Sequence, residues 1–501
     1  MMINVKRLLL ASFMNLVGLT IYAQSDIEII HQLKPVGKNY MTNKDILAKE
    51  IVFPETIYKT YIDTNANRIT VQLRYLSPEG KITHNTGTMV VYDLGLQKEK
   101  WSKKINYLQT DIDQHNDLII QTTGKRSYSL DAETGVEKWE VKNKIIYNDP
   151  DQKMGIGYKV KDFGPVNDQL EGIDLTNGIS RWKIKISQSC GINNISHIND
   201  STLIIVASGL HSVNLKNGEG WDYDALTGER SFMRNNNLVY DMVSNLTGDS
   251  ANIYFASKEK ITRLNNDGKV IWSTPLPLEL TSKSGIFKRD SILYMVNYGY
   301  AYSFYYPTRY GKPYLAAFNA NTGKQLYLKT LSKRKAKINT FQTRKDQLSI
   351  VFKNKMAQYS LVDGSLIREK KFKIKPDESL LSYVGNHVYV KTDSLYNSLA
   401  LTDTTTHCIF TEKKKVLVMN DRLEIIKNYD FNELYLNTLQ EKDYRFLVNG
   451  DKTIVIDNLQ RKVATIDVAM KTKLLGTKFY SIRDKSFLEL DIKEIINHNI
   501  P

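Results

Sequence analysis

One hairpin-like pattern recurs along this chain, and it constrains the fold more than any other feature. Its clearest copy has Asp131, Thr134-Gly135 and Trp139 as a skeleton, with eight residues from acid to aromatic and four from glycine to aromatic. In a β-hairpin, Asp131 accepts hydrogen bonds from the turn's backbone, Gly135 supplies a positive φ, and Trp139 covers the sheet from the returning strand. The stretch therefore predicts two antiparallel strands joined by a short turn.

The same skeleton returns at a regular period. Full or nearly full copies are Asp174/Gly178/Trp182, Asp224/Gly228/Phe232 and Asn319/Gly323/Tyr327, with a copy at Asp93/Trp101 that has Gln97 in place of glycine and one at Asn265/Gly268/Trp272 that is one residue shorter. Weaker echoes are Leu361 to Gly364, Met419 to Arg422, and Asp467 with Leu475. Successive landmarks lie 38 to about 58 residues apart, and a four-stranded propeller blade needs roughly 40 to 50. The period predicts an all-β chain built as a single β-propeller of four-stranded blades.

The motif Asp-x-x-Thr-Gly-x-x-x-Trp at this period resembles the repeat of quinoprotein-type (PQQ-like) β-propellers, over residues 85 to 480. That family includes periplasmic alcohol dehydrogenases that hold pyrroloquinoline quinone (PQQ), and the non-enzymatic lipoprotein scaffold of the outer-membrane protein assembly machine. The resemblance implies eight blades, with seven as the alternative. An early strand within Ile51 to Tyr61 or Ile69 to Tyr75 would complete the blade begun near the C-terminus and close the ring.

The N-terminus predicts export. Lys6 and Arg7 precede an apolar run from Leu8 to Ile21, which is too short for a comfortable membrane span and typical of a signal peptide over residues 1–23. The Ala23-Gln24 junction resembles signal peptides of the Bacteroidetes group. We expect a periplasmic or secreted protein without a transmembrane segment after cleavage. Residues 24–50 would form an N-terminal extension, with 32–39 as loop, and 51–501 the propeller; the one helical stripe is 484–498.

The net charge indicates what kind of partner the chain could bind, and the two cysteines limit the metal sites it could form. The formal net charge of +15 becomes +13 when residues 1–23, with Lys6 and Arg7, are removed. This excess favours an acidic partner, unless it only reflects a generally basic, solvated surface. The lysine runs do not interleave with stacking aromatics, so nucleic acid is not expected. Cys190 and Cys408 could pair or remain buried thiols, and they cannot supply a cysteine-based zinc site.

A tyrosine-rich segment is the candidate binding loop. Eight of the 30 tyrosines fall between Tyr294 and Tyr314. The period-two tyrosines at its start predict packing within strands, whereas the spacing breaks past Pro307. Tyrosine offers a flat apolar face and a hydroxyl, suited to a sugar ring or a protein surface. The candidate rim residues are Tyr305, Tyr306, Arg309, Tyr310, Lys312 and Tyr314. Trp221 is a further candidate contact residue, or else it caps its own blade.

Catalysis is the alternative. The dehydrogenases of the family carry adjacent cysteines, which this chain lacks, and no histidine among His84, His115, His197, His211 and His387 has metal-ligand spacing. We therefore expect a non-catalytic, monomeric module without cofactor or metal that binds a cell-envelope protein or a glycan. The competing hypothesis is a periplasmic enzyme that uses the central channel, either a quinone-dependent dehydrogenase or a polysaccharide-active enzyme.

Overall fold

The structure is a computed structural model. It describes residues 28–75, 85–161, 168–186, 192, 194–207, 209–223, 242–249, 251–303, 306–332, 336–373, 380–382, 387–392, 395–400, 407–411, 415–430, 434–435, 437–441, 443–449, 452–468 and 478–496. The predicted signal peptide lies outside these residues.

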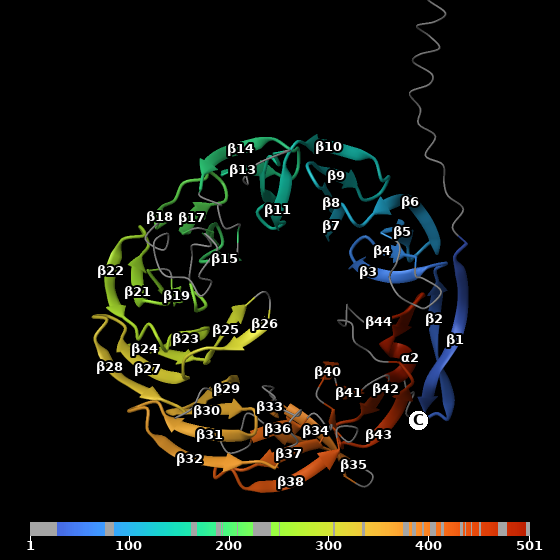
Figure 1. Cartoon of the computed structure of the whole chain (residues 1–501). Coiled ribbons are helices and arrows are strands. Elements are labelled where there is room, and N and C mark those ends of the chain that lie inside the picture. Colours follow the sequence, from blue (N-terminus) through green and yellow to red (C-terminus); the bar gives the residue numbers. More distant parts are fainter. Residues whose placement is uncertain are drawn as a thin grey trace, which may run out of the picture.

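Antiparallel sheets follow one another around a ring (Figure 1). Eight of them are separate four-stranded sheets, and a ninth, eight-stranded sheet consists of two groups of four, so the described residues form ten four-stranded blades. The all-β propeller of four-stranded blades is confirmed. The expected number, eight or seven, is wrong, because it was taken from the family resemblance although the sequence carries nine turn landmarks. The tenth blade joins the two ends of the chain, and its outer strands meet at a turn that begins at Asn39, which is not among the sequence landmarks. Blade 9 turns at Asp457 and not at the expected Asp467, which follows β43.

Blades 1 to 5 each use four consecutive strands, numbered here from the ring's inner side to its outer edge. Blade 1 comprises β3 (Thr56–Asp63), β4 (Arg68–Arg74), β5 (Thr86–Asp93) and β6 (Lys98–Asn106). Blade 2 comprises β7 (Thr110–His115), β8 (Leu118–Thr123), β9 (Ser127–Asp131) and β10 (Glu137–Val141). Blade 3 comprises β11 (Lys144–Asp149), β12 (Met154–Tyr158), β13 (Gln169–Asp174) and β14 (Ser180–Lys185). Blade 4 comprises β15 (Asn194–His197), β16 (Thr202–Val206), β17 (Leu210–Asn214) and β18 (Asp222–Tyr223). Blade 5 comprises β19 (Thr247–Asp249), β20 (Asn252–Ala256), β21 (Lys260–Asn265) and β22 (Val270–Pro275).

Blades 6 and 8 carry inserted hairpins, between the second and third strands in blade 6 and between the first and second strands in blade 8. Blade 6 comprises β23 (Ser284–Arg289), β24 (Ile292–Asn297), β27 (Tyr314–Asn319) and β28 (Gln325–Thr330), with β25 (Tyr300–Ser303) and β26 (Tyr306–Arg309) inserted. Blade 7 comprises β29 (Ile338–Arg344), β30 (Gln347–Phe352), β31 (Lys355–Ser360) and β32 (Leu366–Lys371). Blade 8 comprises β33 (Leu380–Ser382), β36 (His407–Thr411), β37 (Lys415–Met419) and β38 (Ile425–Asp430), while the inserted β34 (His387–Thr392) and β35 (Leu395–Ala400) pair with β39 (Leu434–Tyr435). Blade 9 comprises β40 (Asn437–Glu441), β41 (Tyr444–Asn449), β42 (Lys452–Ile456) and β43 (Lys462–Ile466).

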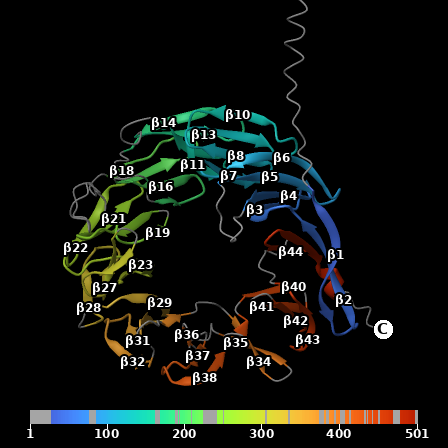
Figure 2. The same cartoon turned by 45° about the vertical axis from the view of Figure 1, so that its right-hand side comes forward.

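Blade 10 closes the ring with strands from both ends of the chain. It comprises β44 (Lys478–Arg483), β45 (Ser486–Asp491), β2 (Lys44–Val52) and β1 (Ile30–Asn39). Figure 2 shows these strands beside blade 1. β1 also pairs with β43 of blade 9, from Gly37 opposite Ile466 to Asn39 opposite Ala464. The shared blade is confirmed, but its N-terminal strands are not those expected.

Three sequence-based assignments are wrong. Residues 32–39 form a strand and not a loop; the β1/β2 register shifts between Pro35 and Gly37, two residues that favour a loop in sequence. The segments 57–61 and 69–75 belong to blade 1. The expected helix over 484–498 is mostly β45, followed by the short α2 (Ile492–Ile496). Among the described residues no helix is both long and apolar enough to cross a membrane.

The core lies between neighbouring blades. Second strands are buried on both faces, as in β24, where only Ile292 is partly exposed. Outermost strands are largely exposed, as in β28, which has no fully buried residue. Each blade therefore presents its outer strand at the rim of the disc.

Candidate functional site

The repeat's aromatic residue fastens each of blades 1 to 6 to the blade that follows it. The Trp139 indole N–H donates to the carbonyl of Leu175 at 3.0 Å, and a Cβ on Gly178 would lie 2.9 Å from the same indole. Gly178, with φ of 74°, thus provides the turn and leaves room for the ring. The aromatic was expected to cover its own sheet, whereas it contacts the turn of the following blade. The other contacts of this kind are Trp101 on Gly135, Trp182 on Gly218, Trp221 on Gly268, Trp272 on Gly323 and Tyr327 on Gly364.

Trp221 is one of these fastening residues. Its indole N–H donates to the carbonyl of Asn266 in blade 5. The turn that receives Trp182 begins at Asn214, ten residues before Asp224, where the sequence analysis places this copy of the repeat. Asp224 and Gly228 lie outside the described residues.

The closing junction lacks this contact in the part of the chain that the structure describes. Gln97, with φ of 51°, replaces the turn glycine of blade 1. A cavity of about 350 Å³ lies there, lined by Leu94, Gln97, His31 and Glu50 among others. The buried Glu50 carboxylate accepts a hydrogen bond from Lys34 at 2.7 Å. Two further cavities lie between blades, one of about 380 Å³ beside Lys138 and Lys153 and one of about 410 Å³ beside His197 and Asp249.

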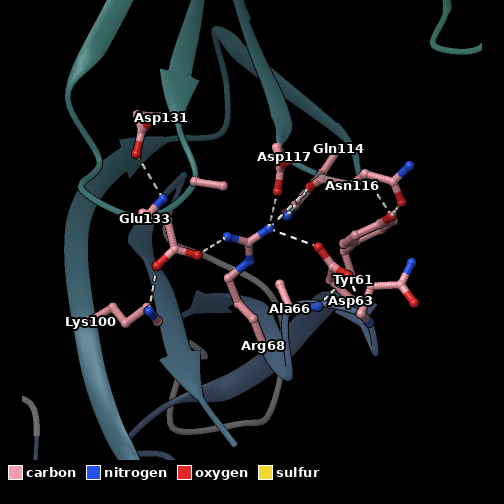
Figure 3. A network of polar contacts seen from close by, with 12 residues as sticks. Tyr61, Asp63, Ala66, Arg68, Lys100, Gln114, Asn116, Asp117, Asp131 and Glu133 are labelled. Atoms are coloured by element: carbon pink, nitrogen blue, oxygen red, sulfur yellow. Dashed lines mark hydrogen bonds and ion pairs between the residues drawn. The ribbon is translucent and has the colours of Figure 1, made fainter.

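A polar network joins blades 1 and 2 (Figure 3). The fully buried Arg68 guanidinium contacts Asp63 at 2.8 Å within blade 1, and Asp117 at 3.1 Å and Glu133 at 2.5 Å in blade 2. Lys100 pairs with the other oxygen of Glu133. The carboxylates surround a guanidinium that stays charged, so the arrangement suits fastening the two blades and not proton transfer.

The candidate rim hairpin is only partly described. Tyr305 lies outside the described residues, and the backbones of Tyr306 and Arg309 pair with Ser303 and Tyr300 across β25 and β26. In Figure 1 the hairpin projects inside the ring.

The rest of this candidate site divides between surface and core. Tyr310 is partly buried, with the Lys258 ammonium 4.7 Å from its ring centroid, and Lys312 is exposed. Tyr314 is fully buried, and its hydroxyl lies 2.9 Å from that of Thr281. Tyr314 therefore packs in the core between blades and does not belong to an exposed binding surface, because it lies on β27, the third strand of its blade.

The described histidines are dispersed. His197 contacts Tyr147 and lies 3.4 Å from Asp149, whereas the buried His211 contacts Asp222 at 2.6 Å. His115 lies 4.0 Å from Asp151. No group of three potential metal ligands occurs among the described residues. His84 and Cys190 lie outside them, and the side chains of His387 and Cys408 are not described.

The outer strands share a β-bulge just before the aromatic position. In blades 1 to 3 the bulged residues are Lys100, Lys138 and Arg181. Lys138 lies 3.0 Å from Asp131, the acid that begins its own turn. Burial raises the pKa of Asp131, but hydrogen bonds from Lys138 and from the turn outweigh burial and hold the pKa at about 2. We call these three outer strands the charged arc.

In blades 5 to 8 the same position is aliphatic and exposed. The bulged residues are Ile271, Leu326, Ile367 and Ile426. Their turns begin with a neutral residue, Asn265, Asn319, Ser360 and Asn420. We call these four outer strands the apolar arc. Sequence reasoning missed it, although aligning the repeats on the aromatic and reading the preceding residue shows the change from Lys/Arg to Ile/Leu.

Blade 9 shows the same position covered. Its bulged residue, Val463, is only 3% exposed, because β1 pairs along the outer edge of β43. The Tyr40 N–H donates to the Val463 carbonyl at 2.8 Å, and the Asp467 N–H donates to the Val36 carbonyl at 2.6 Å. Val36 belongs to the apolar cluster that covers Val463.

Comparison with known proteins agrees with the repeat. No curated protein matches the chain. Similar solved structures include BamB from Moraxella catarrhalis (13% identity, 71% of this chain and 96% of that chain, TM-score 0.33), the computationally designed Ika8 protein (10%, 74% and 97%, 0.31) and Hsv2 of Kluyveromyces lactis (6%, 75% and 99%, 0.30). The family model described as outer membrane protein assembly factor BamB matches residues 82–274. This match supports PQQ-like propeller repeats in blades 1 to 5.

Proposed function

We propose that this protein is a non-catalytic, exported propeller that binds another protein in the cell envelope, with the apolar arc as its principal contact surface. The observation that carries this proposal is the set of four exposed aliphatic side chains at equivalent positions of consecutive blades. Exposed apolar groups that gather on one part of a surface mark interaction sites more often than isolated ones do. The name of the matching family model, an outer-membrane assembly factor, supports a protein partner in the envelope.

The rim hairpin is proposed as a second contact region. Lys312 is exposed beside Tyr310, whose ring lies beneath Lys258. The cations favour an acidic protein or glycan there. Tyr310→Ala together with Lys312→Ala should weaken binding through this region without affecting the apolar arc.

A photo-crosslinking amino acid tests the principal surface in cells that export the chain. Leu326 in the apolar arc and Val136 in blade 2 are matched positions, because both are aliphatic and 48% exposed. A crosslinker at residue 326 should form discrete adducts with envelope proteins, and adding Ile367→Lys should remove them. A crosslinker at residue 136 should not form them. Equal adducts at both positions would contradict the proposal, as would tight binding of PQQ with calcium.

A further inference from the structure

We propose that the apolar arc binds its partner by strand addition: an extended segment of the partner, with aliphatic side chains at alternate positions and acidic flanks, pairs with the outer edge of blade 6, 7 or 8. This inference rests on the proposed function and specifies how the partner is held. Its template is inside the molecule, where β1 pairs with the outer edge of blade 9.

The edge of blade 9 defines what an added strand requires. The bulged residue offers its carbonyl to β1, and the residue four positions later offers its N–H. These are Val463, which accepts from Tyr40, and Asp467, which donates to Val36. The aliphatic side chain of Val463 is buried by the added strand.

Blades 6 and 7 present the same groups. Four residues after Leu326 and Ile367 come Thr330 and Lys371. The next N–H in each strand, that of Leu331 or Phe372, donates inward to the neighbouring strand, to Pro313 and Asn354 respectively. Since backbone groups alternate in direction along a strand, the N–H groups of Thr330 and Lys371 face outward. In blade 8 the corresponding residues are Ile426 and Asp430.

Other blades are protected against strand addition in recognisable ways. Blade 5 has Pro275 at the donor position, opposite Lys260, and proline has no N–H to give. Blades 1 to 3 place Lys or Arg on the bulge, and a charged side chain at an edge strand opposes pairing with another chain. Neither β28 nor β32 has a cation on the bulge or a proline at the donor position, and no described strand pairs with their outer edges.

The positive charges around blade 6 favour acidic residues on either side of the partner's paired segment. Lys324 and Lys329 are exposed on either side of Leu326. The whole chain has a net charge of +15. Acidic residues beside the paired stretch would therefore be attracted, whereas the aliphatic residues would cover Leu326 as Val36 covers Val463.

The experiment uses the purified full chain and a synthetic peptide of alternating valine and threonine with glutamates at both ends. A second peptide has the same side chains, but alternate backbone nitrogens are methylated so that they cannot donate. The first peptide should bind, and amide hydrogen exchange should slow at Thr330 and Lys371. Leu326→Lys combined with Ile367→Lys should weaken binding at least about tenfold, the loss expected when buried aliphatic contacts are replaced by charge.

A backbone variant separates strand addition from simple apolar contact. Thr330→Pro removes the outward donor of blade 6 and keeps Leu326, so protection at blade 6 should vanish, whereas Thr330→Ala should retain it. Equal binding of the methylated peptide would overturn strand addition but leave the apolar contact surface in place. Failure of the first peptide to bind, with crosslinking at residue 326 intact, would overturn only this inference. Failure of both would overturn the proposed function too.

Discussion

The charged arc of blades 1 to 3 and the apolar arc of blades 5 to 8 share a backbone and differ in chemistry. Both have a turn whose first side chain accepts backbone hydrogen bonds, as Asp131 accepts from Thr134 and Asn319 accepts from Thr322. Both have a β-bulge on the outer strand. The same β-bulge therefore has opposite effects in the two arcs: a cation on the bulge discourages pairing with another strand, whereas an aliphatic side chain permits it.

The two differences within each turn are coupled. In blade 2 the carboxylate of Asp131 pairs with Lys138 on the bulge. In blade 6 the neutral Asn319 makes the same turn without needing a cation on the bulge, and Leu326 occupies that place. Changing the acid to an amide thus frees the bulge to carry an aliphatic residue. Blades 1 and 2 are also joined by the ion pairs of Arg68, and blades 6 and 7 are joined both by an ion pair, Arg289 with Asp346, and by aromatic contacts such as Phe287 with Phe341.

The largest loss of stability is expected from removing Arg68, the buried cation that joins blades 1 and 2. Arg68→Ala leaves the buried Asp63 carboxylate without its guanidinium, and losing one partner of a buried pair costs about 3–5 kcal/mol. Denaturant unfolding should show this loss. Arg126→Ala is the control, because its pair with Glu140 is exposed and such pairs contribute about 0–1 kcal/mol. Similar losses for both variants would show that Arg68 does not fasten blades 1 and 2.

The second-largest effect is expected from shortening the buried side chain on the bulge of blade 9, and the same change on the exposed bulge of blade 6 should have little effect. Val463→Ala removes two buried methyl groups beneath β1 and should lower the free energy of unfolding by about 2 kcal/mol. Leu326→Ala, at an exposed bulge, should change it by less than about 0.5 kcal/mol. The same unfolding measurement applies. An equal effect at Leu326 would mean that the chain itself covers the apolar arc.

Much of the fold could be predicted from the repeat, since Asp131 and Gly135 perform tasks within one turn that fix their spacing. What the aromatic residues touch could not, because Trp139 meets Gly178 in another blade, through packing that a single hairpin does not contain. Nor could the closing strand β1, whose Pro35 and Gly37 favour a loop in sequence and which depends on β43 for pairing. The apolar arc could have been predicted only by comparing the same position in several blades, because a single exposed leucine is common on protein surfaces.

A smaller effect is expected from converting the charged arc. Lys138→Ile with Arg181→Ile gives blades 2 and 3 the bulge chemistry of blades 6 and 7. The exposed edges should then favour pairing between copies, so the molar mass measured by light scattering should rise with protein concentration. Lys138→Gln with Arg181→Gln removes the charges without adding apolar surface, and it should associate less. If the glutamine variant associates and the isoleucine variant does not, then charge repulsion between copies, and not protection of the strand edges, keeps the wild-type chains apart.

The smallest effect concerns acid. A carboxyl group whose folded pKa lies below its unfolded value of about 3.9 stabilises the fold above that pH and loses this contribution as pH falls towards the folded pKa. The folded pKa of Asp131 is about 2. Asp131→Asn keeps the turn, as Asn319 does, but loses the pair with Lys138. Between pH 5 and pH 2, the free energy of unfolding of the wild type should therefore fall to that of this variant. At neutral pH the difference is that of an exposed pair, below about 1 kcal/mol.

Asn319→Asp is the matched change in the apolar arc. Because Leu326 offers no cation, the added carboxylate should raise the free energy of unfolding above pH 4 by less than Asp131 does, and adding Leu326→Lys should increase this gain. A constant difference between wild type and Asp131→Asn across this range would mean that the carboxylate of Asp131 is not specifically stabilised by the bulge cation, and that the two arcs differ only at their edges.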